Sequence, residues 1–194
     1  MSELLDPDRP MRADARRNHA RILQAARELF AGEQPEVQID EIARGAGVGV
    51  GTVYRHFPDK EALMGELVRQ RFCLFNVRLG EAVADQVSSP FEALADALRA
   101  HAAWMAEDAA TRFAFMSGGE RVFAYAASEM EEFMRLSSLL VERAKAAGQL
   151  MDEFDAEDIP MFMCGVCAAI DKRHAGWDWR RHLELILRGM RTPA

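Results

Sequence analysis

The chain has 194 residues, of which 49% are hydrophobic, which indicates a folded globular protein of one domain or two small ones rather than a disordered segment. No apolar run approaches 18 residues, the acidic N-terminus has no signal-peptide pattern, and an odd count of three cysteines does not suggest a disulfide framework. We therefore expect a cytoplasmic protein without a membrane partner, while the net charge of −7 argues against general nucleic-acid binding unless the charge is unevenly distributed.

The N-terminal part of the chain carries a concentration of basic residues. Residues 1–13 contain two prolines and alternate in charge, which predicts a flexible arm, and a helix with one apolar face is expected over residues 14–31. Residues 9–27 hold six arginines against one acid, whereas residues 61–194 hold 15 basic and 21 acidic residues. A basic segment on an acidic body suits local contact with phosphates, and the alternative is an ordinary solvated helix face.

Two short helices joined by a tight turn are predicted within residues 38–57. Apolar residues at helical spacing give the first helix a buried face, and Gly45 and Gly47 supply the backbone freedom that a sharp turn needs. The second helix turns Val53 and Phe57 inward and leaves small or polar side chains outward. A helix with so little bulk on its outer side can enter the major groove of DNA.

Three motifs are the most specific feature of this region: Ile22-Leu23-x-Ala25-Ala26-x-x-Leu29-Phe30, Ile39-x-x-Ile42-Ala43-x-x-Ala46-Gly47-Val48 and Gly51-Thr52-Val53-Tyr54-x-His56-Phe57-x-x-Lys60-Glu61-x-Leu63. Over residues 16–64 they resemble the DNA-binding domain of the TetR family of bacterial transcriptional regulators. The sequence departs from that family at Gln38, where Thr or Ser usually caps the helix, and at Gly49-Val50, where Ser-Lys is frequent. The resemblance implies a repressor that a small ligand releases from a palindromic operator.

The second short helix and its flanks are expected to contact the DNA. Thr52 and Arg55 are predicted nearest to base edges, while Tyr54 and Lys60 are predicted to hold phosphates, as the matching residues commonly do in the family. The glycines near the helix start would permit close approach. The full predicted DNA-binding set is Arg17, Gln38, Arg44, Gly49, Val50, Gly51, Thr52, Tyr54, Arg55, His56 and Lys60.

The remainder of the chain is predicted to be helical, without strand-like alternation or internal repeats. The expected helices lie over about residues 59–84, 89–105, 111–116, 120–147, 156–170 and 179–190. The fold is therefore predicted to be all-α with about nine helices. Its predicted parts are an arm (1–13), a DNA-binding domain (14–64, with the helix-turn-helix at 38–57) and an effector-binding and dimerisation domain (65–194).

Methionine and phenylalanine residues are abundant in the middle helices, which favours an adaptable apolar cavity over polar chemistry. We predict that a small, largely apolar effector binds there and weakens DNA binding. The predicted wall residues are His101, Trp104, Phe113, Met116, Arg121, Phe123 and Met134. The alternative is a packed core without a cavity.

The last two predicted helices are candidates for the interface of a two-fold homodimer. The stretch 161–170 is apolar on every face, so one side needs a partner beyond its own domain. Pairing both helices with their mates would give a four-helix bundle. The predicted interface residues are Gly165, Ala168, Ala169, Leu183, Ile186, Leu187 and Met190.

Other chemistry finds little support in the sequence. The glycines between residues 45 and 51 lack the spacing of a dinucleotide-binding loop and follow a helix rather than a strand. Cys164 and Cys167 have no second pair for a metal, so small buried cysteines are favoured over a metal or redox site. We therefore predict no enzyme, metal or cofactor. The rival functions are an all-α enzyme, which needs a buried acid–base set, and a helical interaction module, which leaves the polar helix face unexplained.

Overall fold

The computed structural model describes residues 13–32, 37–85, 89–170 and 176–192, and these ranges form ten α-helices without a β-sheet. Most of the predicted arm, residues 1–12, lies outside the described residues. The helices are α1 (Ala13–Phe30), α2 (Ile39–Ala46), α3 (Val50–His56), α4 (Lys60–Ala84), α5 (Pro90–Glu107), α6 (Ala109–Ser117), α7 (Glu120–Ala124), α8 (Ala127–Ala146), α9 (Asp158–Ile170) and α10 (Trp179–Gly189). The all-α prediction is confirmed, with one helix more than the number expected.

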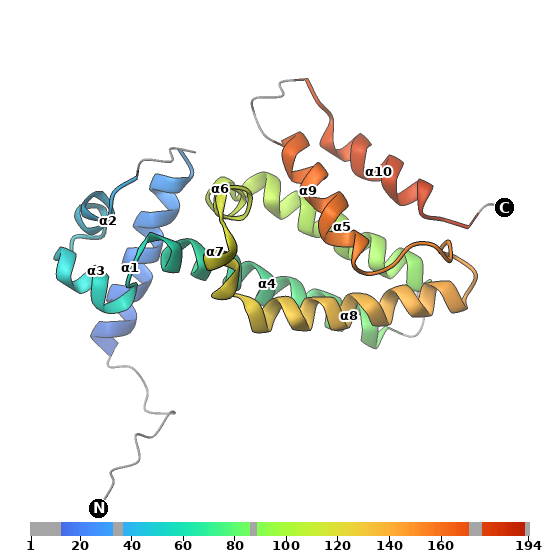
Figure 1. The fold of residues 1–194 in the computed structure, drawn as a ribbon, viewed down its shortest axis with the longest axis horizontal. Helices are drawn as coiled ribbons and strands as arrows, with labels where there is room; N and C mark the ends of the chain where they lie inside the picture. The colour runs from blue at the N-terminus through green and yellow to red at the C-terminus, as the bar shows by residue number, and fades with distance from the viewer. Residues whose placement is uncertain (1–12, 33–36, 86–88, 171–175, 193–194) are drawn as a thin grey trace, which may run out of the picture.

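Helices α1 to α3 gather at one end of the molecule, which we call the head, and α5 to α10 form the body with most of α4 (Figure 1). Ile22, Phe30 and Ile42 are fully buried where α1 packs on α2. The first turn of α4 is fixed by Asp59, whose side chain accepts a hydrogen bond from Ala62 N at 2.8 Å. Helix α4 then continues without a break across the predicted domain boundary at residues 64 and 65.

The prediction of one long helix over residues 120–147 is wrong. The chain turns at Tyr125 and Ala126 and forms two helices, α7 and α8. The packing explains the turn. Ala126 is fully buried, and Tyr125 lies so close to α4 that a Cβ built on Gly65 would stand 2.5 Å from the Tyr125 Cβ. Helices α7 and α8 both pack on α4, and the turn between them allows both contacts. The start of α9 also differs, at Asp158 rather than directly after Asp155.

The body is built around α4, α5 and α8, which contact one another in pairs (Figure 1). Helix α9 packs on α5, and α10 packs on α9 at the outer edge. An ion pair from Arg99 Nε to Glu184 Oε1, at 2.7 Å, joins α5 to α10. Within the described ranges, every helix is too short or too polar to cross a membrane.

Candidate nucleic-acid interface and ligand cavity

The turn between α2 and α3 is held by the backbone of Gly47, which has φ 60°. This left-handed conformation favours glycine, and the Gly47 carbonyl accepts a hydrogen bond from Arg21 Nη2 of α1 at 3.2 Å. Val53 and Phe57 are buried beneath α3, as the sequence predicted. The turn and these two anchors fix α3 at an angle to α2, with its other side facing solvent.

The outer side of α3 carries little bulk near the start of the helix. A Cβ added to Gly49 or to Gly51 would meet no heavy atom within 4 Å, so the fold does not require glycine at either position. Tyr54 is 52% exposed. Arg55 is exposed too, and its Nε donates to the Gly51 carbonyl at 3.2 Å, so its guanidinium lies along its own helix. Thr52 is half-buried beside them.

The other predicted DNA contacts surround α3. Arg17, Gln38, Arg44 and Val50 are exposed, and Lys60 is half-buried at the start of α4, with Nζ 5.6 Å from the centroid of the Phe30 ring. Glu41 Oε2 accepts a hydrogen bond from the backbone N–H of Gln38 at 2.9 Å and so stabilises the start of α2. The structure thus gathers these residues around one end of the molecule, and their contact with DNA stays a prediction.

His56 lies differently from the outward position that the sequence predicted. Its ring is half-buried and stands edge-on to His19 of α1, with centroids 5.8 Å apart, while His19 stacks on Phe57 at 4.8 Å. Burial, followed by the charges of His56 and Arg69, lowers the pKa of His19 despite the opposing charge of Glu66. His56 therefore contributes to the packing of α3 on α1.

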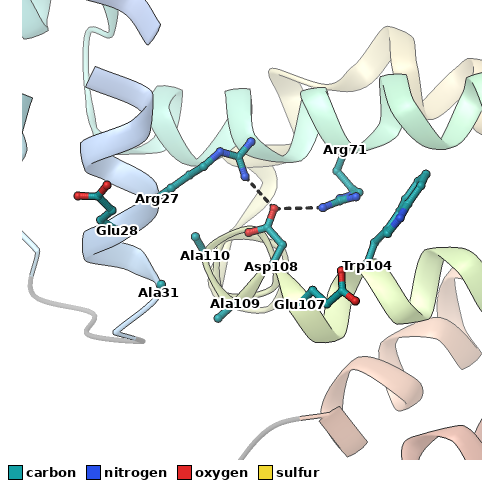
Figure 2. A pocket seen from close by; sticks show the side chains of 9 residues that line it. All are labelled: Arg27, Glu28, Ala31, Arg71, Trp104, Glu107, Asp108, Ala109 and Ala110. Atoms are coloured by element: carbon teal, nitrogen blue, oxygen red, sulfur yellow. Dashed lines mark hydrogen bonds and ion pairs between the residues drawn. The ribbon is translucent and has the colours of Figure 1, made fainter. Parts of the chain in front are cut away.

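A network of charged side chains joins the head to the body (Figure 2). Asp108, between α5 and α6, accepts from Arg27 of α1 at 2.7 Å and from Arg71 of α4 at 3.1 Å. Its carboxylate also caps α6 by accepting from Thr111 N at 3.0 Å. Burial alone would raise the pKa of Asp108, but the hydrogen bonds from Thr111 and the two arginine charges outweigh it and lower the pKa.

Two further contacts cross the same junction. The Arg121 guanidinium of α7 pairs with Asp59, the cap of α4, and the ring of Phe113 on α6 stacks on Phe30 of α1 with centroids 5.9 Å apart. Since α6 contacts α1, α4 and α5, a shift of α6 would move α1 and with it the head.

A cavity of about 350 Å³ lies inside the body, bounded by α4 to α9. Its wall consists of five phenylalanines, four methionines and three other residues: Phe72, Phe75, Phe115, Phe123, Phe133, Met116, Met130, Met134, Met163, His101, Pro160 and Cys164. The volume falls within the range of small-molecule sites, and the apolar wall is typical of them.

Four of the predicted wall residues line this cavity, namely His101, Met116, Phe123 and Met134. The other three do not. Trp104 lies at the head–body junction, with Arg71 5.1 Å above its ring (Figure 2), while Phe113 and Arg121 make the junction contacts described above. Helical periodicity assigned the Phe72, Phe75 and Phe133 side chains to the interior, but nothing in the pattern separates a cavity wall from a packed core.

The predicted dimer residues occupy two different environments. Ala169, Leu183, Leu187 and Met190 are buried within the protomer, so they hold α9 and α10 to their own chain rather than facing outward. Ile186 also packs partly against the core, and Ala168 is half-buried. Gly165 is exposed. The outer face of the two helices also exposes Met161 (70%) and Leu185 (55%), which the prediction omitted.

The cysteine pair gives no sign of reactive chemistry. Cys167 is buried, and burial raises the pKa of its thiol to about 12; the pKa of the exposed Cys164 is raised for the same reason. Both thiols therefore stay protonated and weakly nucleophilic at neutral pH. Among the described residues, no cluster of three or more His, Cys, Asp or Glu could hold a metal ion.

Comparison with known proteins covers both parts of the chain. The family model of bacterial regulatory proteins of the tetR family matches residues 22–67, and the model of the C-terminal domain of SbtR-like transcriptional regulators matches residues 89–192. An HTH-type transcriptional regulator of Staphylococcus aureus strain USA300 is 34% identical over 85 residues. That match spans 43% of this chain and 45% of the relative, so it covers less than half of either protein.

Solved structures resemble the chain over nearly its whole length. A TetR transcription regulatory protein from Mycobacterium vanbaalenii is 30% identical, with a TM-score of 0.58, over 94% of this chain and 99% of that one. FadR from Bacillus subtilis, solved in complex with stearoyl-CoA, has a TM-score of 0.69 at 19% identity over 89% of this chain and 99% of that one. At that identity, the second likeness shows the shared fold alone.

Proposed function

Because the chain belongs to the TetR family of transcriptional regulators, we propose that it binds a palindromic operator in double-stranded DNA as a homodimer and leaves it when a small, largely apolar effector enters the body. The family consists of DNA-binding regulators rather than enzymes. We place its action in the bacterial cytoplasm, where the operator lies, and its effect as repression.

The proposal of DNA binding rests on the outer side of α3. Glycine inside a helix costs about 1 kcal/mol relative to alanine, and no neighbour requires Gly51 to be small. A function explains the cost: without a side chain at Gly49 or Gly51, the backbone of α3 can approach the base edges closely. The exposed Tyr54 beside them can reach the phosphate backbone, which fixes the position of the helix on the duplex.

The DNA-binding proposal is tested by fluorescence anisotropy with genomic fragments selected by the purified protein, followed by one operator at several salt concentrations. Lys60→Ala should weaken binding to all sequences alike and reduce the salt slope by about one unit, because one phosphate contact is lost. Lys145→Ala, in α8 at the far end of the body, is the matched control and should bind like the wild type. An unchanged slope for Lys60→Ala would remove that residue from the interface.

The homodimer is proposed to form through the outer face of α9 and α10. Met161 and Leu185 are exposed there, and the exposed Gly165 and half-buried Ala168 allow a second helix to come close. Leu185→Glu should give a monomer in sedimentation at micromolar concentration and greatly weaken operator binding, because two half-sites are then read separately. Leu74→Glu, an equally exposed leucine on α4, is the control.

The effector is proposed to act through α6. Phe115 and Met116 of α6 line the cavity, while Thr111 and Phe113 of the same helix contact the head–body junction. A ligand that favours another position of α6 would change the angle of the head and the spacing of the two α3 helices in the homodimer. The coupling is reciprocal, so bound operator must weaken effector binding by the same factor. A coupling of about 1–3 kcal/mol would change operator affinity roughly 5- to 150-fold.

A further inference from the structure

Among the described residues that line the cavity, His101 is the one with a strongly polar side chain. It lies on α5, is 8% exposed, and its ring stacks on Phe75 with centroids 4.2 Å apart. Its Nδ1 is buried and has no hydrogen-bond partner among the described residues. A buried nitrogen without a partner is costly to a protein, and native structures seldom leave one unless a ligand or another group can use it.

The imidazole is uncharged at neutral pH. Burial, followed by the positive charge of Arg71, lowers the pKa of His101 to about 3. A neutral imidazole has one nitrogen that donates a hydrogen bond and one that accepts. A hydroxyl group can do either, so it can pair with His101 in both tautomers, whereas a carbonyl oxygen can only accept.

The rest of the wall excludes a charged ligand. Its described residues include neither a lysine or arginine nor an aspartate or glutamate, and partial desolvation raises the pKa of the Cys164 thiol, which stays neutral. A carboxylate or ammonium group placed there would lose its hydration without gaining a counterion, which costs several kcal/mol. Of a ligand such as the stearoyl-CoA bound by the Bacillus subtilis protein, only the uncharged acyl chain suits this wall.

The aromatic rings of the wall indicate the shape of the ligand. Phe115 and Phe123 meet edge to face at 5.4 Å, and Phe72 and Phe133 are tilted at 5.5 Å, so ring faces and edges surround the space. A flat aromatic molecule can form the same offset and edge-on contacts. The volume of about 350 Å³ is near the lower end of the range for ligand sites, which limits the ligand to about one or two rings.

From this arrangement we infer that the cavity selects an uncharged, hydroxyl-bearing aromatic molecule of one or two rings, whose hydroxyl pairs with His101 and whose rings lie among the phenylalanines. The inference rests on the proposed role of this cavity as the effector site. It goes beyond that role by fixing the chemical class of the ligand and the residue that recognises it.

Two probes of nearly equal shape test the inference: 2-naphthol and 2-methylnaphthalene, titrated into the purified full-length protein by calorimetry. In the wild type, the affinity ratio of 2-naphthol to 2-methylnaphthalene should exceed the ratio in His101→Phe by about tenfold, the effect of one hydrogen bond to a buried nitrogen. His182→Phe, which changes an exposed histidine on α10, should keep the wild-type ratio. The ¹⁵N resonances of the His101 ring should shift with 2-naphthol and not with 2-methylnaphthalene.

A ratio that is equal in the wild type and His101→Phe, or failure of both probes to bind the wild type, overturns the inference. Should His101→Phe fold poorly, His101→Leu and the ¹⁵N shifts of the wild type decide the same question. Operator anisotropy separates this result from the proposed function. If His101-dependent binding of 2-naphthol leaves operator affinity unchanged, the ligand class stands and the effector switch falls. If an unrelated, charged ligand releases the operator, the switch stands and the ligand class falls.

Discussion

The head and the body of this protein carry function in opposite ways. The outer side of α3 is exposed, and two of its positions, Gly49 and Gly51, have no neighbour within 4 Å of where a side chain would begin. Of the twelve side chains that line the cavity of the body, five are buried and four are half-buried, and several of their rings touch one another. A change on the face of α3 should therefore alter binding without altering stability, whereas a change in the cavity should alter both. The predictions below test that contrast.

Gly51→Phe should separate binding from folding most clearly. A large side chain at this open position would hold α3 away from the DNA and lower operator affinity by about 100-fold, or about 2.7 kcal/mol. Stability should stay within about 0.5 kcal/mol of the wild type or rise, since the helix loses a glycine. Anisotropy and urea unfolding measure the two effects. Gly80→Phe on α4 is the matched control, because Gly80 is equally open but belongs to the body.

His101 should show the opposite behaviour, a functional residue whose burial governs stability. Its pKa is about 3 in the folded protein against about 6.5 unfolded, so the unfolded chain binds more protons between these values and stability falls as the pH falls. Between pH 7 and pH 5 the wild type should lose about 2 kcal/mol from this group alone. Urea unfolding at both pH values should show a correspondingly smaller loss for His101→Phe.

Three groups bear on the interpretation of that experiment. The pKa of His19 is also lowered, but His19 is present in both proteins and cancels in the comparison. The carboxylates of Asp108 and Glu66 have lowered pKa values, so their stabilising contributions are lost only below about pH 4.5, outside the window. Equal pH slopes for the wild type and His101→Phe would contradict the burial of a neutral imidazole.

The same contrast decides what the sequence could predict. Local rules are sufficient for most of the head: Gly47 lies in the left-handed turn that its position required, and Val53 and Phe57 are buried at the expected spacing. His56 is the exception, because its packing depends on His19 of α1. These features depend on residues a few positions apart. The family assignment came from the same short motifs and is confirmed by the comparisons with known proteins.

The body depends on contacts between distant residues, which periodicity cannot supply. The turn at Tyr125 exists because that side chain packs on Gly65, sixty positions earlier, and both stretches alone read as uninterrupted helix. Likewise, Leu183 and Leu187 give their helix an apolar face, and the sequence pattern is the same whether that face meets a partner or its own domain. Only the fold shows that it faces inward. The cavity wall was predicted only in part, because its residues converge from six helices and no local pattern brings them together.

The junction between the two regions offers the smallest expected effect and the sharpest test of their communication. Asp108→Asn keeps the shape of the side chain but removes the charge that Arg27 and Arg71 share (Figure 2). Stability should fall by about 1 kcal/mol, because the pairs are only partly shielded from solvent and an amide still caps α6. The effector should release the operator less completely, since α6 then holds α1 less firmly.

Asp96→Asn removes an exposed ion pair with Arg99 away from the junction and should change neither quantity. If Asp108→Asn binds operator and effector normally and retains the full factor between them, the signal passes instead through the Phe30–Phe113 contact or the pairing of Arg121 with Asp59, and Phe113→Leu and Arg121→Gln would then be the next variants to compare.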